Sequence, residues 1–81
     1  MKKLAILGAT GLVGQRFIQL LSGHPFFEIS ALAASDNSSG KKYGEAVQWH
    51  LETPSPDKIS EMVVRDCRPD FEADYVLSAL P

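Results

Sequence analysis

Blocks of hydrophobic and polar positions predict a strand, a helix and a second strand within the first 34 residues. The apolar run at residues 4–7 follows two lysines and ends at Gly8, so we predict a buried parallel strand over residues 3–8. From Leu12 the apolar positions recur with the helical period. Residues 27–34 alternate and then finish apolar, as in a strand that becomes covered toward its carboxyl end.

The predicted helix is amphipathic and has signals at both ends. Its apolar stripe contains Val13, Phe17, Ile18, Leu20 and Leu21. The side chains expected to face solvent are Gln15, Arg16 and Gln19. We expect the Thr10 hydroxyl to cap the start, Gly23 to turn left-handed past the end, and Pro25 to prevent continuation.

The second half of the chain is less regular. The polar composition of residues 35–42 predicts a loop. The segment at residues 44–56 is irregular, with Val47 and Trp49 as its apolar anchors. Its detailed structure cannot be predicted from the pattern.

Two further strands are predicted near the carboxyl end. Asp57 is a candidate cap for a short helical turn that leads to a strand at residues 62–64, and residues 75–80 form the last strand. One strong helix leaves a face of such a parallel sheet uncovered. We therefore expect a Rossmann-type α/β fold in which residues 1–81 are the incomplete N-terminal part of a dinucleotide-binding domain, with any catalytic and dimerisation domain absent.

Composition narrows the possible partners. The 81 residues contain 8 Lys+Arg against 10 Asp+Glu and are 44% hydrophobic, which is typical of one soluble domain. Because the basic residues are few and scattered, nucleic acid is not an expected partner, and no apolar window approaches the ~20 residues of a membrane span. A single cysteine, Cys67, can supply neither an internal disulfide nor a metal cage, so we expect a cytoplasmic protein without a metal site.

A glycine-rich loop joins the first strand to the helix. Residues 8–14 read GATGLVG, a G-x-x-G-x-x-G spacing that differs from the common G-x-G-x-x-G fingerprint. Gly8 permits the tight turn, Gly11 lets a pyrophosphate approach the backbone, and Gly14 allows close packing of helix on strand. We expect free backbone N–H groups around Gly11, Leu12 and Val13 to point at the phosphates. The alternative is that the glycines only relieve packing.

The end of the second strand is expected to recognise the adenosine ribose. An acid about 20 residues beyond the last glycine would bind the ribose hydroxyls, and here the position holds Ser35. Ser38, Ser39 and Lys41 add hydroxyls and a cation, which favours NADP, whereas Asp36 would favour the unphosphorylated cofactor. Lys42 is expected to be a solvated loop residue.

Other reactive residues carry weaker signals. Cys67 lies between Arg65 and Arg68, which makes a nucleophile one interpretation, but a half-exposed spacer thiol is the simpler one. His24 and His50 are interpreted as structural. No metal-ligand spacing is present, and no catalytic residue is assigned within the chain.

Three segments together resemble one enzyme family. They are Gly8 to Phe17, then Leu32 to Ser35 with Ser38-Ser39-Gly40-Lys41-Lys42-Tyr43, and finally Val76-Leu77-Ser78-Ala79-Leu80-Pro81. In this order, and with Trp49 following, they resemble the archaeal and fungal form of aspartate-semialdehyde dehydrogenase.

The resemblance implies a function and a set of site residues. It implies NADP as cofactor, and the cofactor-binding positions would be Gly8, Thr10, Gly11, Leu12, Val13, Gly14, Ser35, Ser38, Lys41, Ser78, Ala79, Leu80 and Pro81. It implies reductive dephosphorylation of L-aspartyl-4-phosphate, an acyl phosphate, by a cysteine and a histidine that lie outside these 81 residues, in a protein that assembles as a homodimer or homotetramer.

Other functions remain open from the sequence. A related acyl-phosphate or malonyl-CoA reductase would share the loop, because its substrate is chosen by residues outside this chain. A non-catalytic NAD(P)-binding sensor of the atypical short-chain reductase type also begins with such a loop. A structural fragment that never folds alone is the third possibility.

Overall fold

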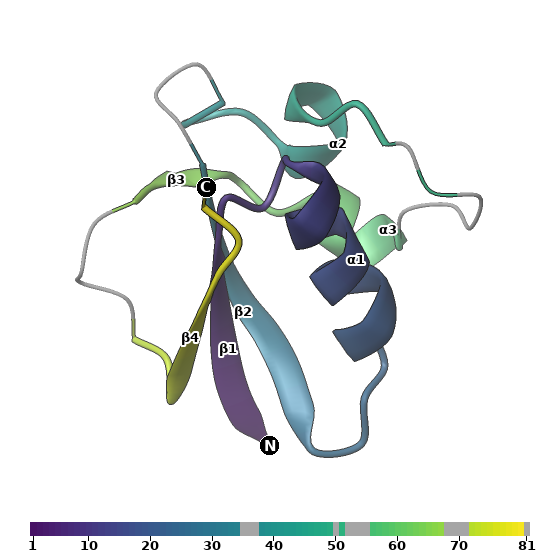
Figure 1. Ribbon diagram of the computed structural model, residues 1–81, viewed down its shortest axis with the longest axis vertical. Helices are drawn as coiled ribbons and strands as arrows, with labels where there is room; N and C mark the ends of the chain where they lie inside the picture. Colours follow the sequence, from purple (N-terminus) through teal and green to yellow (C-terminus); the bar gives the residue numbers. More distant parts are fainter. Residues whose placement is uncertain (35–37, 50, 52–55, 68–71, 81) are drawn as a thin grey trace.

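The computed structural model describes residues 1–34, 38–49, 51, 56–67 and 72–80. The strands and helices, shown in Figure 1, follow one another as β1 (Lys2–Leu7), α1 (Leu12–Leu21), β2 (Phe27–Ala34), α2 (Tyr43–Ala46), α3 (Asp57–Ser60), β3 (Arg65–Asp66) and β4 (Tyr75–Ser78).

The strands form one parallel sheet in the order β3-β2-β1-β4, which confirms the predicted fold class. The chain moves outward from β1 to β2 and β3 and then returns to place β4 on the other side of β1. Ligands of open α/β sheets bind at such a reversal, outside the carboxyl ends of the strands. The glycine loop follows β1 directly, so it lies at this point.

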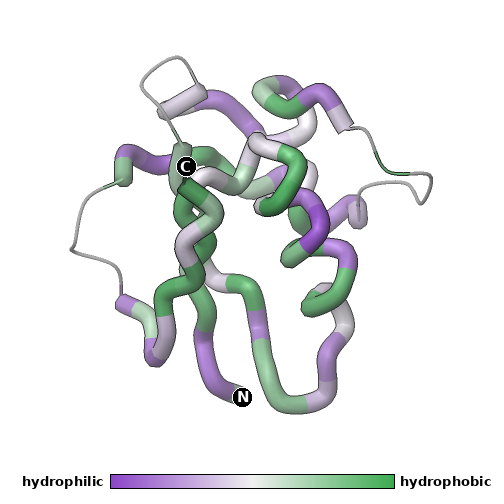
Figure 2. Tube along the Cα trace, viewed as in Figure 1, coloured by the Kyte–Doolittle hydropathy of each residue, from purple (hydrophilic) through white to green (hydrophobic). Residues whose placement is uncertain are grey.

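The hydrophobic core lies between the sheet and the helices, which gather to one side of the sheet in Figure 1. Apolar residues follow the central strands β1 and β2, as Figure 2 shows. The buried cluster comprises Ile6, Ala9, Ile18, Ile29, Leu32, Ala34, Tyr43, Ile59 and Val64. Ile6 of β1 and Ile18 of α1 are fully buried, so this helix is held onto the strand that carries the loop.

The predicted buried face of α1 is partly wrong. Ile18 is buried and Phe17 and Leu21 are half-buried, but Val13 and Leu20 remain 56% and 66% exposed. Gln15, which we expected to face solvent, is only 1% exposed. Apolar residues occur on more than one face of this helix, so their period does not identify the buried face. The face that carries Gly14 packs inward because glycine has no side chain to hold the helix away from the loop.

The helix termini also differ from the prediction. Gly11, with φ −75° and ψ 171°, is the N-cap of α1 and no side chain caps it, so the Thr10 cap is wrong. Gly23 has φ +75°, which confirms its left-handed turn. The short turn α3 begins at Asp57, but Pro56 occupies its N-cap and the predicted Asp57 cap is therefore wrong.

The third strand lies beyond its predicted position. Residues 62–64 do not join the sheet. Instead, Val63 forms an isolated antiparallel bridge with Lys42, and the backbone N–H of Val64 donates to the Lys41 carbonyl at 2.8 Å. The parallel strand β3 is Arg65–Asp66, and the last strand, β4, ends at Ser78 instead of residue 80. An extended apolar triplet indicates burial but does not identify which segment it pairs with.

Candidate dinucleotide-binding site

The glycine loop makes a tight turn at the carboxyl end of β1. Gly8 has φ +73°, a conformation that side chains other than glycine rarely adopt. The backbone N–H groups of Gly8 and Ala9 both donate to the Ala33 carbonyl, at 2.8 and 3.0 Å. The turn is therefore fixed to β2, and the role predicted for Gly8 is confirmed.

Gly14 and Gly11 meet very different surroundings. A Cβ at Gly14 would clash with the Gly8 carbonyl oxygen and lie 2.7 Å from the Ala9 Cα, which confirms the close helix packing. A Cβ at Gly11 would meet only the Gly8 oxygen, at an ordinary 3.6 Å. Space is therefore open in front of Gly11, where the prediction placed a pyrophosphate.

Four consecutive carbonyl groups of the loop accept hydrogen bonds from within the protein. The Gly8 oxygen accepts from the Gly11 N–H at 3.2 Å, and the Gly11 oxygen accepts from the Gln15 N–H at 2.9 Å. The Ala9 oxygen accepts from the Tyr43 hydroxyl at 2.7 Å, and the Thr10 oxygen accepts from the Gln15 Nε2 at 3.0 Å. The electronegative groups of the loop are thus occupied internally.

Unlike the carbonyl groups, several N–H groups of the loop make no hydrogen bond within the described residues. Those of Thr10, Leu12 and Val13 have no acceptor in the part of the chain that the structure describes. The first turn of a helix leaves such donors unpaired, and the helix dipole adds positive potential there. The prediction that the Gly11 N–H is also unpaired is wrong, because it closes the turn onto Gly8.

The end of β4 lies beside the glycine loop. The Ala79 N–H donates to the Leu7 carbonyl at 2.8 Å, and a Cβ at Gly8 would lie 3.0 Å from the Ala79 carbonyl carbon. The Leu80 N–H donates to the Ser78 hydroxyl at 3.4 Å. Ser78, Ala79 and Leu80 are therefore brought to the loop, whereas Pro81 lies outside the described residues.

The candidate ribose segment is held by backbone bonds. The Gly40 N–H donates to the Val64 carbonyl at 2.8 Å, and the Lys41 N–H donates to the Ser38 carbonyl at 3.3 Å. Ser38 is half-buried and Lys41 is exposed, so both are accessible to a ligand. Ser35, Asp36 and Asn37 lie outside the described residues.

Lys42 forms an ion pair on the surface instead of contributing to the candidate ribose segment. Its Nζ lies 2.9 Å from the Glu61 carboxylate, and both side chains are exposed. The hydrogen bond that Lys42 donates to Glu61 and the charge of that carboxylate raise the pKa of Lys42. This agrees with the prediction of a solvated loop lysine.

Sequence reasoning missed two polar residues that contact the loop. Tyr43 is fully buried, and burial raises the pKa of its hydroxyl. The side chain of Gln15 reaches the loop from α1. A tyrosine that ends a polar loop signals a buried anchor, but its partner comes from 34 residues earlier in the chain and is not visible in the pattern.

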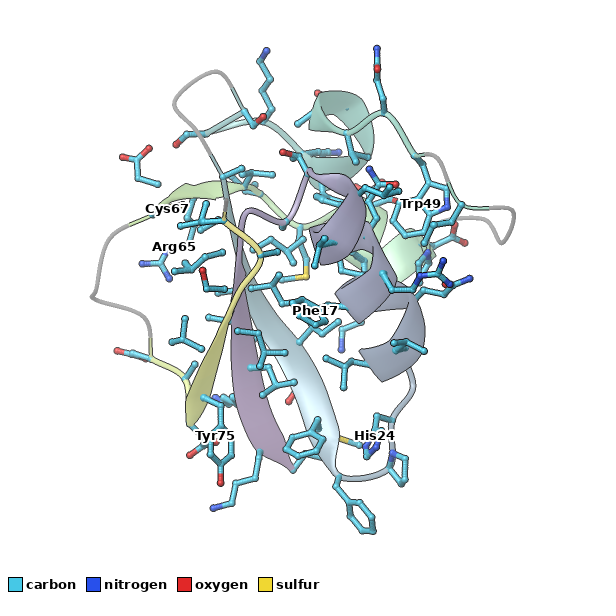
Figure 3. All side chains as sticks on the ribbon, viewed as in Figure 1. Phe17, His24, Trp49, Arg65, Cys67 and Tyr75 are labelled. Carbon is cyan, nitrogen blue, oxygen red and sulfur yellow. The ribbon has the colours of Figure 1, made fainter. Side chains whose placement is uncertain are left out.

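Cys67 and His24 occupy structural positions. The exposed thiol of Cys67 lies 3.6 Å from the Ala34 carbonyl oxygen, beside the end of β2. His24 Nδ1 accepts a hydrogen bond from the Phe26 N–H at 3.1 Å, and its ring contacts Phe27 with centroids 5.0 Å apart. Figure 3 places His24 and Tyr75 at the end of the sheet opposite Cys67.

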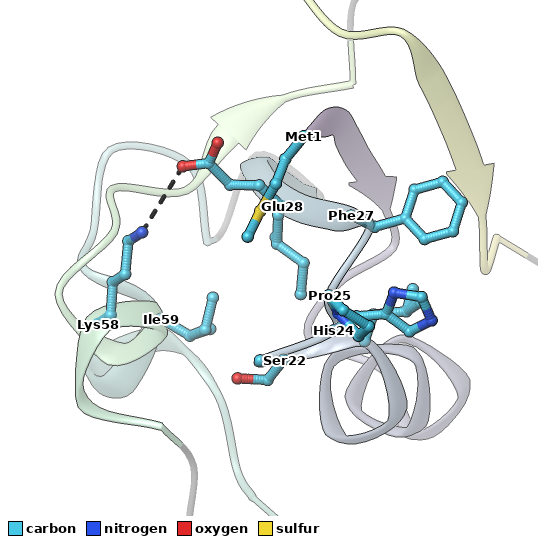
Figure 4. Close-up of a pocket in the computed structure, with 11 residues that line it drawn as sticks. Met1, Ser22, His24, Pro25, Phe27, Glu28, Lys58 and Ile59 are labelled. Atoms are coloured by element: carbon cyan, nitrogen blue, oxygen red, sulfur yellow. Dashed lines mark ion pairs between the residues drawn. The ribbon is translucent and has the colours of Figure 1, made fainter.

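A separate hollow of about 390 Å³ lies at that opposite end, shown in Figure 4. Its walls include His24, Phe27 and Ile59, and the ion pair between Lys58 and Glu28 spans 3.6 Å. Its lining includes Met1 and Phe27 at the amino ends of β1 and β2, whereas the glycine loop follows the carboxyl end of β1. Across the described ranges, no group of three potential metal ligands occurs and no helix is long and apolar enough to cross a membrane.

Comparison with known proteins identifies relatives of this chain. The model of the semialdehyde dehydrogenase NAD binding domain matches residues 3–81. Two proteins named aspartate-semialdehyde dehydrogenase are similar to this chain. The one from Aspergillus fumigatus is 52% identical over 98% of the chain, and the one from Methanothermobacter thermautotrophicus is 47% identical over 100% of it. The chain spans only 22% and 24% of the length of these two relatives.

A solved structure gives the same result. The crystal structure of aspartate semialdehyde dehydrogenase with NADP from Candida albicans superposes with a TM-score of 0.96 at 50% identity. It matches 100% of this chain, which covers 24% of that structure. The chain therefore belongs to the semialdehyde dehydrogenase family, in the region of its NAD binding domain.

Proposed function

We propose that this chain is the N-terminal part of the cofactor-binding domain of an aspartate-semialdehyde dehydrogenase and that it binds NADP. The observation that carries the proposal is the polarity of the glycine loop: its carbonyls are occupied by internal donors, and N–H groups at Thr10, Leu12 and Val13 remain for an anion. The loop sits at the strand-order reversal of a parallel sheet. The relative from Candida albicans was crystallised with NADP.

The parts of the cofactor are assigned to separate residues. The pyrophosphate binds in front of Gly11, where a side chain would otherwise obstruct it. The ribose 2′-phosphate is assigned to Ser38 and Lys41, and to Ser35 from its position in the sequence alone, since hydroxyl donors and a cation suit a phosphate. Residues 78–80 lie beside the loop at the end of β4 and are assigned to the cofactor site with it, and Pro81 is assigned from its position in the sequence alone.

The complete protein would catalyse reduction of an acyl phosphate. We propose that it converts L-aspartyl-4-phosphate, NADPH and a proton to L-aspartate 4-semialdehyde, phosphate and NADP⁺, a step toward lysine, methionine and threonine. When bound, the cofactor supplies the hydride. The catalytic cysteine and histidine and the dimerisation domain belong to the remaining length of such an enzyme, which would act in the cytoplasm as a homodimer or homotetramer.

Calorimetric titration with 2′-phospho-ADP-ribose and with ADP-ribose tests the cofactor assignment. We expect the phosphorylated ligand to bind more tightly. Equal affinity or preference for ADP-ribose would contradict the NADP proposal, and absence of binding by a folded protein would favour a structural or sensor role.

The acyl substrate needs a separate assay of the natural protein that carries this sequence. We expect phosphate-dependent reduction of NADP⁺ with aspartate semialdehyde as substrate. Activity only with malonyl-CoA or N-acetyl-glutamyl phosphate, in the direction of NADPH oxidation, would move the chain to one of the related reductases.

A further inference from the structure

We infer that Tyr43 and Gln15 are positioning residues that turn the carbonyl groups of the glycine loop away from the cofactor phosphates. The inference rests on the proposed function, because it concerns how the same loop accepts its anion. It adds two residues that lie outside the glycine motif and that come from different helices.

Tyr43 reaches the loop from α2. Its hydroxyl donates to the Ala9 carbonyl oxygen at 2.7 Å, and its side chain is fully buried. The residue is itself held in place, since its N–H donates to the Met62 carbonyl at 2.7 Å and its ring meets Trp49 edge to face, 6.4 Å between centroids. The hydroxyl therefore has little freedom to follow the Ala9 carbonyl if that group rotates.

Gln15 holds the next carbonyl from α1. Its Nε2 donates to the Thr10 oxygen at 3.0 Å and to the Gln48 oxygen at 2.9 Å. Both protons of the amide nitrogen are thereby committed. One side chain thus ties the glycine loop to the segment that follows α2.

The consequence for a ligand follows from peptide geometry. In a planar trans peptide the C=O and N–H bonds point in opposite directions, so holding the Ala9 carbonyl inward directs the Thr10 N–H outward. If the Ala9 carbonyl lost its donor, the peptide could rotate and present an oxygen where the phosphate must bind. An exposed carbonyl dipole repels an anion, whereas an N–H attracts it.

Tyr43 also connects the two halves of the site. It follows Lys42 directly, at the end of the segment that carries Ser38 and Lys41. The hydroxyl bond to Ala9 therefore fixes the pyrophosphate loop relative to the ribose segment. A cofactor that spans both halves benefits from this connection, and a ligand that touches only the ribose segment does not.

A buried tyrosine needs a hydrogen-bond partner whatever its role, so the test must separate positioning from simple stabilisation. Tyr43→Phe removes only the hydroxyl, and Tyr75→Phe makes the same change at an exposed tyrosine on β4, at the opposite end of the sheet. Each variant of the natural protein is titrated with NADP⁺ and with adenosine 2′-phosphate, which lacks the pyrophosphate, and the two affinities are compared.

We expect Tyr43→Phe to weaken NADP⁺ binding by ~10-fold, because loss of one donor leaves a carbonyl unpaired at the site, and to change adenosine 2′-phosphate binding by less than ~2-fold. Tyr75→Phe should change neither. Equal affinity of Tyr43→Phe and the unchanged protein for NADP⁺, or equal loss for both ligands, would overturn the inference and leave a purely structural tyrosine.

A second pair of variants keeps the test decisive if the tyrosine variant folds poorly. Gln15→Met preserves the length of the side chain and removes its donors, and Gln19→Met makes the same change one turn later on α1, where the residue is half-buried. The same selective loss of NADP⁺ affinity is expected for Gln15→Met alone. Failure of the unchanged protein to bind NADP⁺ would instead overturn the proposed function.

Discussion

The glycine loop and the segment at residues 38–42 serve one proposed ligand but are built differently. In the loop, four successive carbonyls from Gly8 to Gly11 are hydrogen-bonded, two of them to buried side chains. The 38–42 segment is attached through backbone bonds at Gly40 and Lys41, and its lysine side chains are exposed.

This difference separates affinity from selectivity. A tightly constrained loop presents fixed donors to the pyrophosphate, which every dinucleotide shares, so changes there should affect all of them. An exposed segment can exchange side chains without disturbing the core, so changes there should affect the choice between phosphorylated and unphosphorylated ribose. Substitutions in each of the two regions test this division.

Gly14→Ala should destabilise the whole fold. The added methyl would clash with the Gly8 oxygen and lie 2.7 Å from the Ala9 Cα, and backbone atoms cannot rotate away. We expect a loss of about 3 kcal/mol in the free energy of unfolding, measured by urea denaturation. Gly11→Ala is the matched control and should unfold near the unchanged midpoint, because its Cβ has ordinary space. Equal stability of both variants would show that α1 does not pack on the loop as described.

Gly11→Val should abolish binding without unfolding the protein. The backbone at Gly11 has φ −75°, which valine adopts readily, and the nearest atom to its Cβ is 3.6 Å away. The larger side chain fills the space proposed for the pyrophosphate, so calorimetry should show at least ~100-fold weaker binding of both NADP⁺ and NAD⁺. Retained affinity in a folded variant would place the pyrophosphate elsewhere.

Ser38→Asp should change selectivity. A carboxylate at this half-buried position repels a 2′-phosphate, so we expect ~10-fold weaker binding of 2′-phospho-ADP-ribose, with ADP-ribose changed by less than ~2-fold. Titration of both ligands measures the ratio. If both affinities fell equally, the segment would not be the ribose site.

Lys41→Met and Lys42→Met compare adjacent cations. Lys42 is paired with Glu61 at 2.9 Å on the surface, and such exposed pairs contribute little. We expect Lys42→Met to leave cofactor affinity and melting temperature unchanged, and Lys41→Met to weaken 2′-phospho-ADP-ribose by ~5-fold through loss of a phosphate contact. The reverse ranking in the same titration would exchange the roles of the two lysines.

The sequence was sufficient where a regular period extends over many residues. The helix begins at Leu12 and the second strand spans Phe27–Ala34, both as predicted, and the roles of Gly8 and Gly14 follow from a loop placed between a strand and a helix. Periodicity failed for short segments: α2 has four residues, too few to show a helical repeat. The triplet at 62–64 reads as a strand, yet it pairs with the 41–43 region outside the sheet.

The polar residues that complete the site could not be found from local pattern. Gln15 belongs to the polar positions of an amphipathic helix, and only the absence of a side chain at neighbouring Gly14 lets this side pack inward. The Tyr43 hydroxyl donates to the carbonyl of Ala9, which lies 34 residues earlier in the sequence. Hydrogen bonds between segments distant in sequence depend on the tertiary arrangement, and propensity and spacing describe only neighbours.

The central position of β1 has a consequence for how the protein is made. Among the strands that the structure describes, β1 is synthesised before the others yet pairs with both β2 and β4, and β4 is synthesised after the others: the Lys3 N–H donates to the Asp74 carboxylate at 2.7 Å across 71 residues. At about 5–20 residues per second, translation takes on the order of 4–14 s to cover that separation. During this time one edge of β1 has no partner strand. Until β4 is made, that edge of β1 exposes unpaired N–H and C=O groups, which can pair with an incorrect strand.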